Sequence, residues 1–175
     1  MASSSNYFEL LGVPMAFSVS LETLDRNYRE LQSKVHPDRF ANGTEAERRV
    51  AMQLATEVND AYQTLKTPLR RAIYLLKIEG IDVCDEKHTA MDQEFLIQQL
   101  DWRENIEDAR AAKNLSQLES LSRELSAEKR ARLARLEAWF NSAAMQPAAE
   151  AARQLLFIEK LEQDIGDGME ALEQV

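Results

Sequence analysis

Two neighbouring segments of this chain carry apolar residues at every third or fourth position, and this spacing restricts the fold more than any other feature. The first segment runs from about Leu21 to Val35, and the second runs to Leu65. The second opens at Thr44, with Glu47 three positions later, which is the capping-box pattern of a helix start. Apolar residues at this spacing lie on one face of a helix. Because the two faces are similar in length and a loop joins them, they predict an antiparallel helical hairpin with a shared core.

Shorter helical signals flank the hairpin. Residues 6–11 predict a single helical turn capped by Asn6. Beyond the hairpin, Pro68 suits the first turn of a helix, because that turn needs no backbone N–H there. We expect this helix over residues 69–79, ending at Gly80.

The rest of the chain predicts three long helices, over residues 92–111, 115–142 and 147–173. Amphipathic helices with short connections are typical of an antiparallel three-helix bundle. The chain has only five Gly and four Pro, which favours long helices over a turn-rich β-fold. We therefore predict an all-α protein with a hairpin domain over residues 1–77, a linker over 78–91 and the bundle over 92–175.

The two predicted domains differ in charge. Residues 1–77 carry 10 Lys and Arg and 9 Asp and Glu, a net charge of +1, whereas residues 78–175 carry 11 and 21, a net charge of −10. A nucleic-acid partner is not expected, because binding it requires a basic surface that displaces counterions. The simplest interpretation of most of the acidic residues is solubility.

Cofactor and metal sites have no support in the sequence. Cys84 is the single cysteine, so a disulfide framework or a cysteine-based zinc site is excluded, and an ordinary free thiol is the expectation. The sequence has no glycine-rich phosphate loop, metal-ligand cluster or supported Ser or Cys nucleophile. We expect no metal, no cofactor and no catalytic residue.

The sequence also bears on location. No apolar run approaches the roughly 20 residues that cross a bilayer, so no membrane partner is expected. The first residues resemble neither a signal peptide nor a transit peptide, and we expect a cytoplasmic protein of bacterial type. A mitochondrial matrix form whose presequence has been removed stays an alternative.

The tripeptide His36-Pro37-Asp38 follows the first helix of the hairpin. Pro37 biases His36 away from helical geometry, so the helix should end there, and the loop should lose little entropy on docking. The His36 ring can donate or accept a hydrogen bond, and Asp38 can accept one from an Arg or from backbone amides. This chemistry favours recognition over catalysis. A simple helix stop and a His–Asp catalytic pair are the weaker alternatives.

The context of the tripeptide resembles a J-domain over roughly residues 6–75. The resemblance rests on the tripeptide, on residues 7–12 (YFELLG) and on residues 59–65 (NDAYQTL). It implies a DnaK-type ATPase chaperone as partner, whose ATP hydrolysis the tripeptide and a neighbouring basic face stimulate. The matching positions here are His36, Pro37, Asp38, Arg26, Arg29, Lys34 and Arg39. Three acids accompany the three bases of residues 21–35, so this helix is less basic than many J-domains and fits a dedicated partner.

The first bundle helix predicts two different faces. Met91, Phe95, Trp102, Ile106 and Ala109 fall in one narrow sector at 100° per residue, and they form the expected core face. Leu96, Ile97 and Leu100 point largely away from it, beside Asp101, Glu104 and Asp108. Phe157 of the last helix lies off the core stripe of that helix and could extend this patch. Helical geometry alone leaves two interpretations of the patch. It is a protein-binding surface, or its apolar residues pack against the hairpin domain or are simply scattered over the surface.

A short J-domain followed by an acidic three-helix bundle is similar to the HscB-type co-chaperones of iron–sulfur cluster assembly. Residues 68–76 (PLRRAIYLL) and 95–100 (FLIQQL) carry this resemblance. It implies an HscA-like chaperone partner and an IscU-type scaffold protein bound to the bundle. The implied scaffold-binding positions are Leu96, Ile97, Leu100, Asp101, Glu104, Asp108 and Phe157. The alternatives are a J-protein whose bundle binds another client or only dimerises, and a helical enzyme that uses His36 and Asp38.

Overall fold

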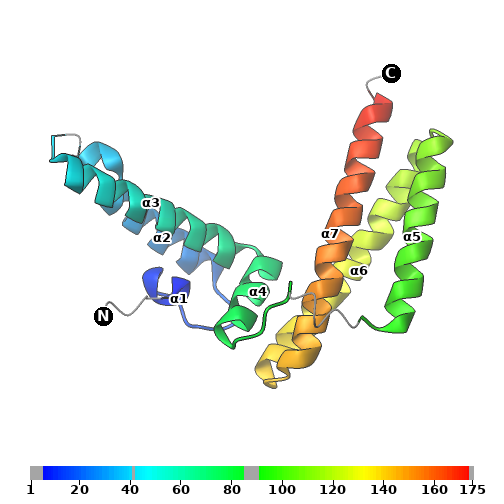
Figure 1. Ribbon diagram of the computed structural model, residues 1–175, viewed down its shortest axis with the longest axis horizontal. Coiled ribbons are helices and arrows are strands. Elements are labelled where there is room, and N and C mark those ends of the chain that lie inside the picture. Colours follow the sequence, from blue (N-terminus) through cyan, green and yellow to red (C-terminus); the bar gives the residue numbers. More distant parts are fainter. Residues whose placement is uncertain (1–5, 41, 85–90, 174–175) are drawn as a thin grey trace. The chain divides into compact units, whose positions relative to one another are not determined.

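Helices account for all the regular structure in the residues that the computed structural model describes, which are 6–40, 42–84 and 91–173. The all-α class predicted from the sequence is confirmed (Figure 1). The elements in chain order are α1 (Tyr7–Leu10), α2 (Leu21–Val35), the 3-10 turn η1 (Pro37–Phe40), α3 (Glu45–Lys66), α4 (Pro68–Ile78), α5 (Gln93–Ala111), α6 (Leu115–Asn141) and α7 (Met145–Glu173).

The chain divides into two compact units, residues 1–75 and 76–175. The first contains α1, α2, η1, α3 and most of α4, and the second contains the α5–α7 bundle. Part of the predicted linker, residues 85–90, lies outside the described residues. The domain limits proposed from the sequence, 1–77, 78–91 and 92–175, therefore stay predictions.

The hairpin of the first unit forms as its capping residues predict. Ser20 accepts a hydrogen bond from the Thr23 amide at 3.3 Å and starts α2. Thr44 and Glu47 form the predicted capping box, each side chain accepting from the backbone N–H of the other, at 3.2 and 2.7 Å. Leu21 was expected on the buried face but is 49% exposed, because it is the first residue of α2, at the margin of the core.

A polar and aromatic network fixes α2 against α3. The rings of Tyr28 and Tyr62 stack with centroids 4.0 Å apart. The Tyr62 hydroxyl donates to Asp25 at 2.8 Å, and the Tyr28 hydroxyl donates to Asn59 at 2.7 Å. Each bond joins α2 to α3, so the network sets the register of the hairpin and thereby the direction in which the outer face of α2 points.

The second unit has one continuous core. The buried α5 residues are those of the predicted core face, Phe95, Trp102, Ile106 and Ala109, with Met91 partly buried beside them. They pack on residues from both other helices, namely Leu118, Leu121, Leu125, Ile158, Leu161 and Ile165. The predicted bundle and its core face on α5 are therefore confirmed.

The predicted helix ends agree with the structure to within one residue except at the start of the last helix. The last helix begins at Met145 and not at Pro147. Pro147 is the third residue of α7, within the first turn, where its missing N–H removes no helical hydrogen bond. Lys113 and Ala143 end α5 and α6 in the left-handed conformation, with φ of 52° and 55°.

Candidate partner-binding sites

The tripeptide forms one tight turn after α2. His36 leaves the helix with φ −58° and ψ 129°, the non-helical geometry that the following proline favours. Pro37 then begins η1, and the Arg39 amide donates to the His36 carbonyl at 3.0 Å. The end of α2 at His36 is as predicted, and the loop expected after it takes the form of a short 3-10 turn.

The polar groups of the turn are arranged toward solvent. Nδ1 of His36 lies 3.3 Å from the Asp38 amide, which donates to it, and 3.4 Å from an oxygen of the Asp38 carboxylate, so Nδ1 is used within the turn and Nε2 is left for a partner. The side chains of His36 and Asp38 are 51% and 89% exposed. One imidazole donor and one carboxylate acceptor are thus presented on a backbone that is already folded.

Arg39 contacts the end of α2. Its guanidinium donates to the Ser33 carbonyl at 3.3 Å, which is one of the carbonyls left without a helical partner in the last turn. Arg39 therefore helps to hold the turn against the helix. Its predicted contact with a partner chaperone stays a prediction.

The predicted basic face of α2 is exposed. It consists of Arg26, Arg29 and Lys34. Asp25, one of the three acids of the same helix, faces α3, where it accepts the Tyr62 hydrogen bond. Only Glu22 and Glu30 remain as exposed acids on α2, so the accessible surface of the helix is more basic than its composition indicates.

An apolar groove of about 310 Å³ adjoins the turn. Val35, the last residue of α2, and Phe40, the last residue of η1, line it together with Val50 and Leu54 of α3. Val50 is 61% exposed. Sequence reasoning missed this groove, although Val50 stands outside the buried stripe of α3 and was the available signal.

The outer face of α5 carries the predicted apolar residues. Leu96, Ile97 and Leu100 are 40%, 56% and 61% exposed. The predicted acids beside them are also exposed: Asp101, Glu104 and Asp108. We call these six residues the α5 face. Three apolar side chains next to three carboxylates on one helix suit a partner that is apolar and basic.

Phe157 lies at the margin of the bundle core. It is off the fully buried stripe of α7, as expected, and packs partly buried against the core, while its predicted part in the exposed patch stays a prediction. Its ring lies edge-on to Phe95, with centroids 6.2 Å apart and planes at 87°. The guanidinium of Arg103 lies 4.9 Å from the centre of the same ring. Part of the Phe157 side chain is therefore covered by Phe95 and Arg103 and part is accessible to a partner.

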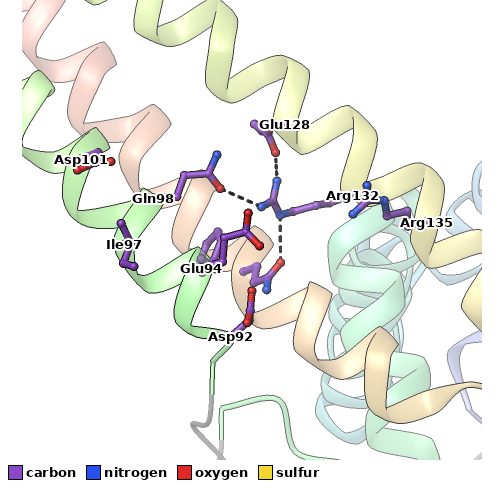
Figure 2. Close-up of a pocket in the computed structure, with 10 residues that line it drawn as sticks. Asp92, Glu94, Ile97, Gln98, Asp101, Glu128, Arg132 and Arg135 are labelled. Carbon is purple, nitrogen blue, oxygen red and sulfur yellow. Dashed lines mark hydrogen bonds and ion pairs between the residues drawn. The ribbon is translucent and has the colours of Figure 1, made fainter.

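A polar groove of about 610 Å³ lies on the side of the bundle that Ile97 and Asp101 border (Figure 2). Arg132 of α6 forms its centre, donating to Gln154 at 3.1 Å, to Gln98 at 3.4 Å and to Glu128. Its guanidinium also lies 5.1 Å from the centre of the Phe95 ring. One side chain thus connects α5, α6 and α7. No pattern in the sequence indicates this groove, because its residues come from three separate helices.

Metal-binding clusters and membrane-spanning helices are both absent from the described residues. Residues 6–40, 42–84 and 91–173 contain no group of three or more His, Cys, Asp or Glu side chains that could hold a metal ion. In the same ranges, no helix has the length and apolarity needed to span a membrane. Cys84 is an exposed free thiol.

Two known protein families match the chain. Residues 6–74 match the DnaJ domain, and residues 91–166 match the family described as the HSCB C-terminal oligomerisation domain. The first match contains the His36-Pro37-Asp38 turn, and the second contains the α5 face and the polar groove.

Whole proteins match over nearly the full chain. A co-chaperone protein HscB homolog of Burkholderia thailandensis is 53% identical over 168 residues, covering 96% of both chains. The one from Paraburkholderia xenovorans is 51% identical and covers 99% of both. Among solved structures, the chaperone HscB from Vibrio cholerae has a TM-score of 0.83 at 38% identity, covering 96% of this chain and 99% of that one. The human co-chaperone HscB has a TM-score of 0.87 at 27% identity, covering 95% and 83%.

Proposed function

The chain belongs to the HscB family of J-domain co-chaperones, and from this premise we propose that it links two proteins in iron–sulfur protein maturation. One is an HscA-like, DnaK-type ATPase chaperone, and the other is an IscU-type scaffold protein. The observation that supports this most is that an exposed tripeptide turn and an exposed apolar face occur in separate compact units. The adaptor has no turnover of its own, in keeping with relatives named as co-chaperones.

The turn is suited to engage the chaperone. Nε2–H of His36 can donate to the chaperone surface, and the Asp38 carboxylate can accept from an Arg or from backbone amides. Exposed cations on α2, with Arg26 and Arg29 among them, add attraction to an acidic partner surface. Because η1 is already formed, docking costs little ordering entropy.

The α5 face is suited to bind the scaffold protein. Burial of Leu96, Ile97 and Leu100 against a partner would remove apolar surface from water, which is the main favourable contribution in most protein association. The neighbouring carboxylates would select a basic partner and orient it. Bound together, the two sites bring the scaffold to the chaperone at the moment when ATP hydrolysis is stimulated.

The two roles can be tested separately with single-site variants. We expect His36→Gln to abolish stimulation of the chaperone's ATPase in a steady-state assay while scaffold binding is unchanged. We expect Leu96→Ser with Leu100→Ser to weaken scaffold binding by more than about tenfold, measured by calorimetry, with ATPase stimulation kept in the absence of scaffold. Both side chains are exposed, so the urea midpoint should stay near that of the unchanged protein. Stimulation that survives His36→Gln would exclude the proposed role of the turn.

Self-association is the second candidate role of the α5 face, because the matched family is described as an oligomerisation domain. Sedimentation of the protein and of the Leu96→Ser, Leu100→Ser variant separates the two roles. A dimer that the substitutions dissociate, together with unchanged scaffold binding, would assign the face to self-association instead.

A further inference from the structure

The polar groove continues the α5 face around the start of α5. Asp92 and Glu94 line it at the N-terminal end of the helix, and Ile97 and Asp101 belong to both surfaces. Asp92 precedes Leu96 by four residues, which is about one helical turn or roughly 6 Å. A partner protein that covers Leu96 and Ile97 therefore lies next to the groove, and its adjoining residues can enter it.

The charges in the groove are unequal. Arg132 is paired with Glu128, so these two charges offset each other. Asp92, Glu94 and Asp101 remain against the single guanidinium of Arg135, and none of these four has an ion pair within the described part of the chain. Figure 2 shows Asp92 just before α5 and Glu94 in its first turn, with Arg132 and Arg135 on α6. The unpaired charge of the groove is therefore negative, by two charges.

The groove is also held open by its own framework. The Arg132 side chain is only 12% exposed and donates to acceptors on all three helices. It stacks on the buried ring of Phe95, which lies at the base of the groove. A preformed acidic groove loses little conformational entropy when a partner enters it, so complementary charge is converted into affinity.

We propose that this groove receives a basic segment of the scaffold protein, with Asp92 and Glu94 as binding residues beyond the α5 face. The proposal rests on the scaffold-binding role proposed above. Lys or Arg side chains of the partner pair with the carboxylates of Asp92 and Glu94, which have no ion pair among the described residues. Arg135 repels the same segment and so limits its charge and fixes which end of the groove it occupies.

The test compares two variants that should change the scaffold affinity in opposite directions, measured by calorimetry. We expect Asp92→Asn with Glu94→Gln to weaken binding about fivefold at an ionic strength of about 0.05 M, and the loss to shrink at about 0.5 M. We expect Arg135→Gln to tighten binding about twofold at the lower ionic strength. Asn keeps a side chain that suits the position before a helix, so α5 should form normally, which circular dichroism and the urea midpoint check.

A matched control removes two negative charges elsewhere. Glu119 and Glu170 are exposed on α6 and α7 and do not line the groove. Glu119→Gln with Glu170→Gln alters the net charge equally and should leave the affinity within about twofold. An equal loss in this control would overturn the proposal, because the effect would then come from total charge. The proposal would also be overturned if Asp92→Asn with Glu94→Gln tightened scaffold binding while Arg135→Gln weakened it, because that result would indicate an acidic occupant of the groove.

The parent proposal is tested in the same assay by the Leu96→Ser, Leu100→Ser variant. If that variant loses affinity while the groove variants bind like the unchanged protein, the groove proposal fails and the scaffold-binding role stands. If it binds normally, the scaffold-binding role fails first.

Discussion

The tripeptide turn and the α5 face both present side chains to solvent, but different interactions hold them in place. The turn is held by hydrogen bonds between residues two to six positions apart, such as Asp38 to His36 and Arg39 to Ser33. The α5 face is held from behind, by a buried core and by Arg132, whose acceptor on α5 is 34 positions away. Local bonds position the turn, whereas tertiary packing positions the face.

This difference predicts which substitutions should disrupt each site. A turn that depends on a few partly exposed hydrogen bonds should lose its geometry through changes within it and tolerate changes in distant packing. A helical face should tolerate changes on its own exposed side chains and be lost through changes in the core beneath it.

The largest effect is expected in the core of the bundle. Leu125 is fully buried beneath α5, and Leu125→Ala should lower the free energy of unfolding of the bundle by about 3 kcal/mol, with scaffold binding falling as the bundle unfolds. Both tryptophans, Trp102 and Trp139, lie in this unit, so the urea midpoint from tryptophan fluorescence reports on it directly. ATPase stimulation should persist where only the bundle has unfolded.

The matched control for that change is on the surface of the same bundle. Leu156 is 36% exposed on α7, and Leu156→Ala should cost no more than about 0.5 kcal/mol. If Leu125→Ala removed ATPase stimulation together with scaffold binding, under conditions where amides of residues 45–66 stay protected from hydrogen exchange, the proposed division of labour would be wrong.

An intermediate effect is expected in the turn. In His36→Asn the amide oxygen can replace Nδ1 as acceptor for the Asp38 N–H, whereas the longer side chain of His36→Gln extends past it. We expect the Asp38 amide to exchange with solvent about fivefold faster in the Gln variant, which corresponds to about 1 kcal/mol, and little faster in the Asn variant. Both variants lack the Nε2–H donor and should fail to stimulate the ATPase. Full activity of the Asn variant would show that only turn geometry matters.

The smallest effect is expected from alkaline pH on the bundle. Lys129 is partly buried, which by itself lowers its pKa, but hydrogen bonds to Glu162 at 2.8 Å and to Glu159 at 3.0 Å outweigh this and raise the pKa above its usual value. The resulting stabilisation is complete below the unfolded-state pKa of about 10.4 and is lost as the pH rises through the higher folded-state value.

The measurement compares the urea midpoint of the bundle, from tryptophan fluorescence, with that of Lys129→Met between about pH 9 and about pH 11. The unchanged protein should lose stability more steeply over that interval than the variant. Tyr7 of the other unit also has a raised pKa, chiefly through burial, and its ionisation therefore destabilises that unit at high pH. Tryptophan fluorescence is used because it reports on the bundle and not on the unit that contains Tyr7. Parallel curves would mean that Lys129 contributes nothing to the pH dependence.

The capping box at Thr44 and the glycine at the end of α4 show that local sequence signals specify where a helix begins and ends. Gly80 adopts φ of 78° and ends the helix as predicted, because a left-handed position favours glycine. Lys113 and Ala143 adopt the same conformation after α5 and α6, at positions where the residue type gives no such signal. The sequence placed these two junctions within a few residues through Asn114 and Pro147, but not their geometry.

The two candidate sites differ in the same respect. His36 and Asp38 are two residues apart, so their pairing follows from the chain itself, and the exposed side of α5 follows from helical periodicity. The partial burial of Phe157 against Phe95, and the pairing of Asp25 with α3, depended on neighbours far away in the sequence. No periodicity within one helix specifies which side chain of another helix will meet it.

By itself, the sequence determined the helices, the turn that follows Pro37 and the two-sided character of α5, because each arises from residues within a few positions of one another. Only the tertiary structure decided that Arg132 would join three helices, that Phe157 would lie at the edge of the core, and that Asp92, Glu94 and Arg135 would share one groove. The physical reason is that hydrogen bonding and apolar periodicity act along one helix, whereas grooves and charge clusters arise from packing between helices.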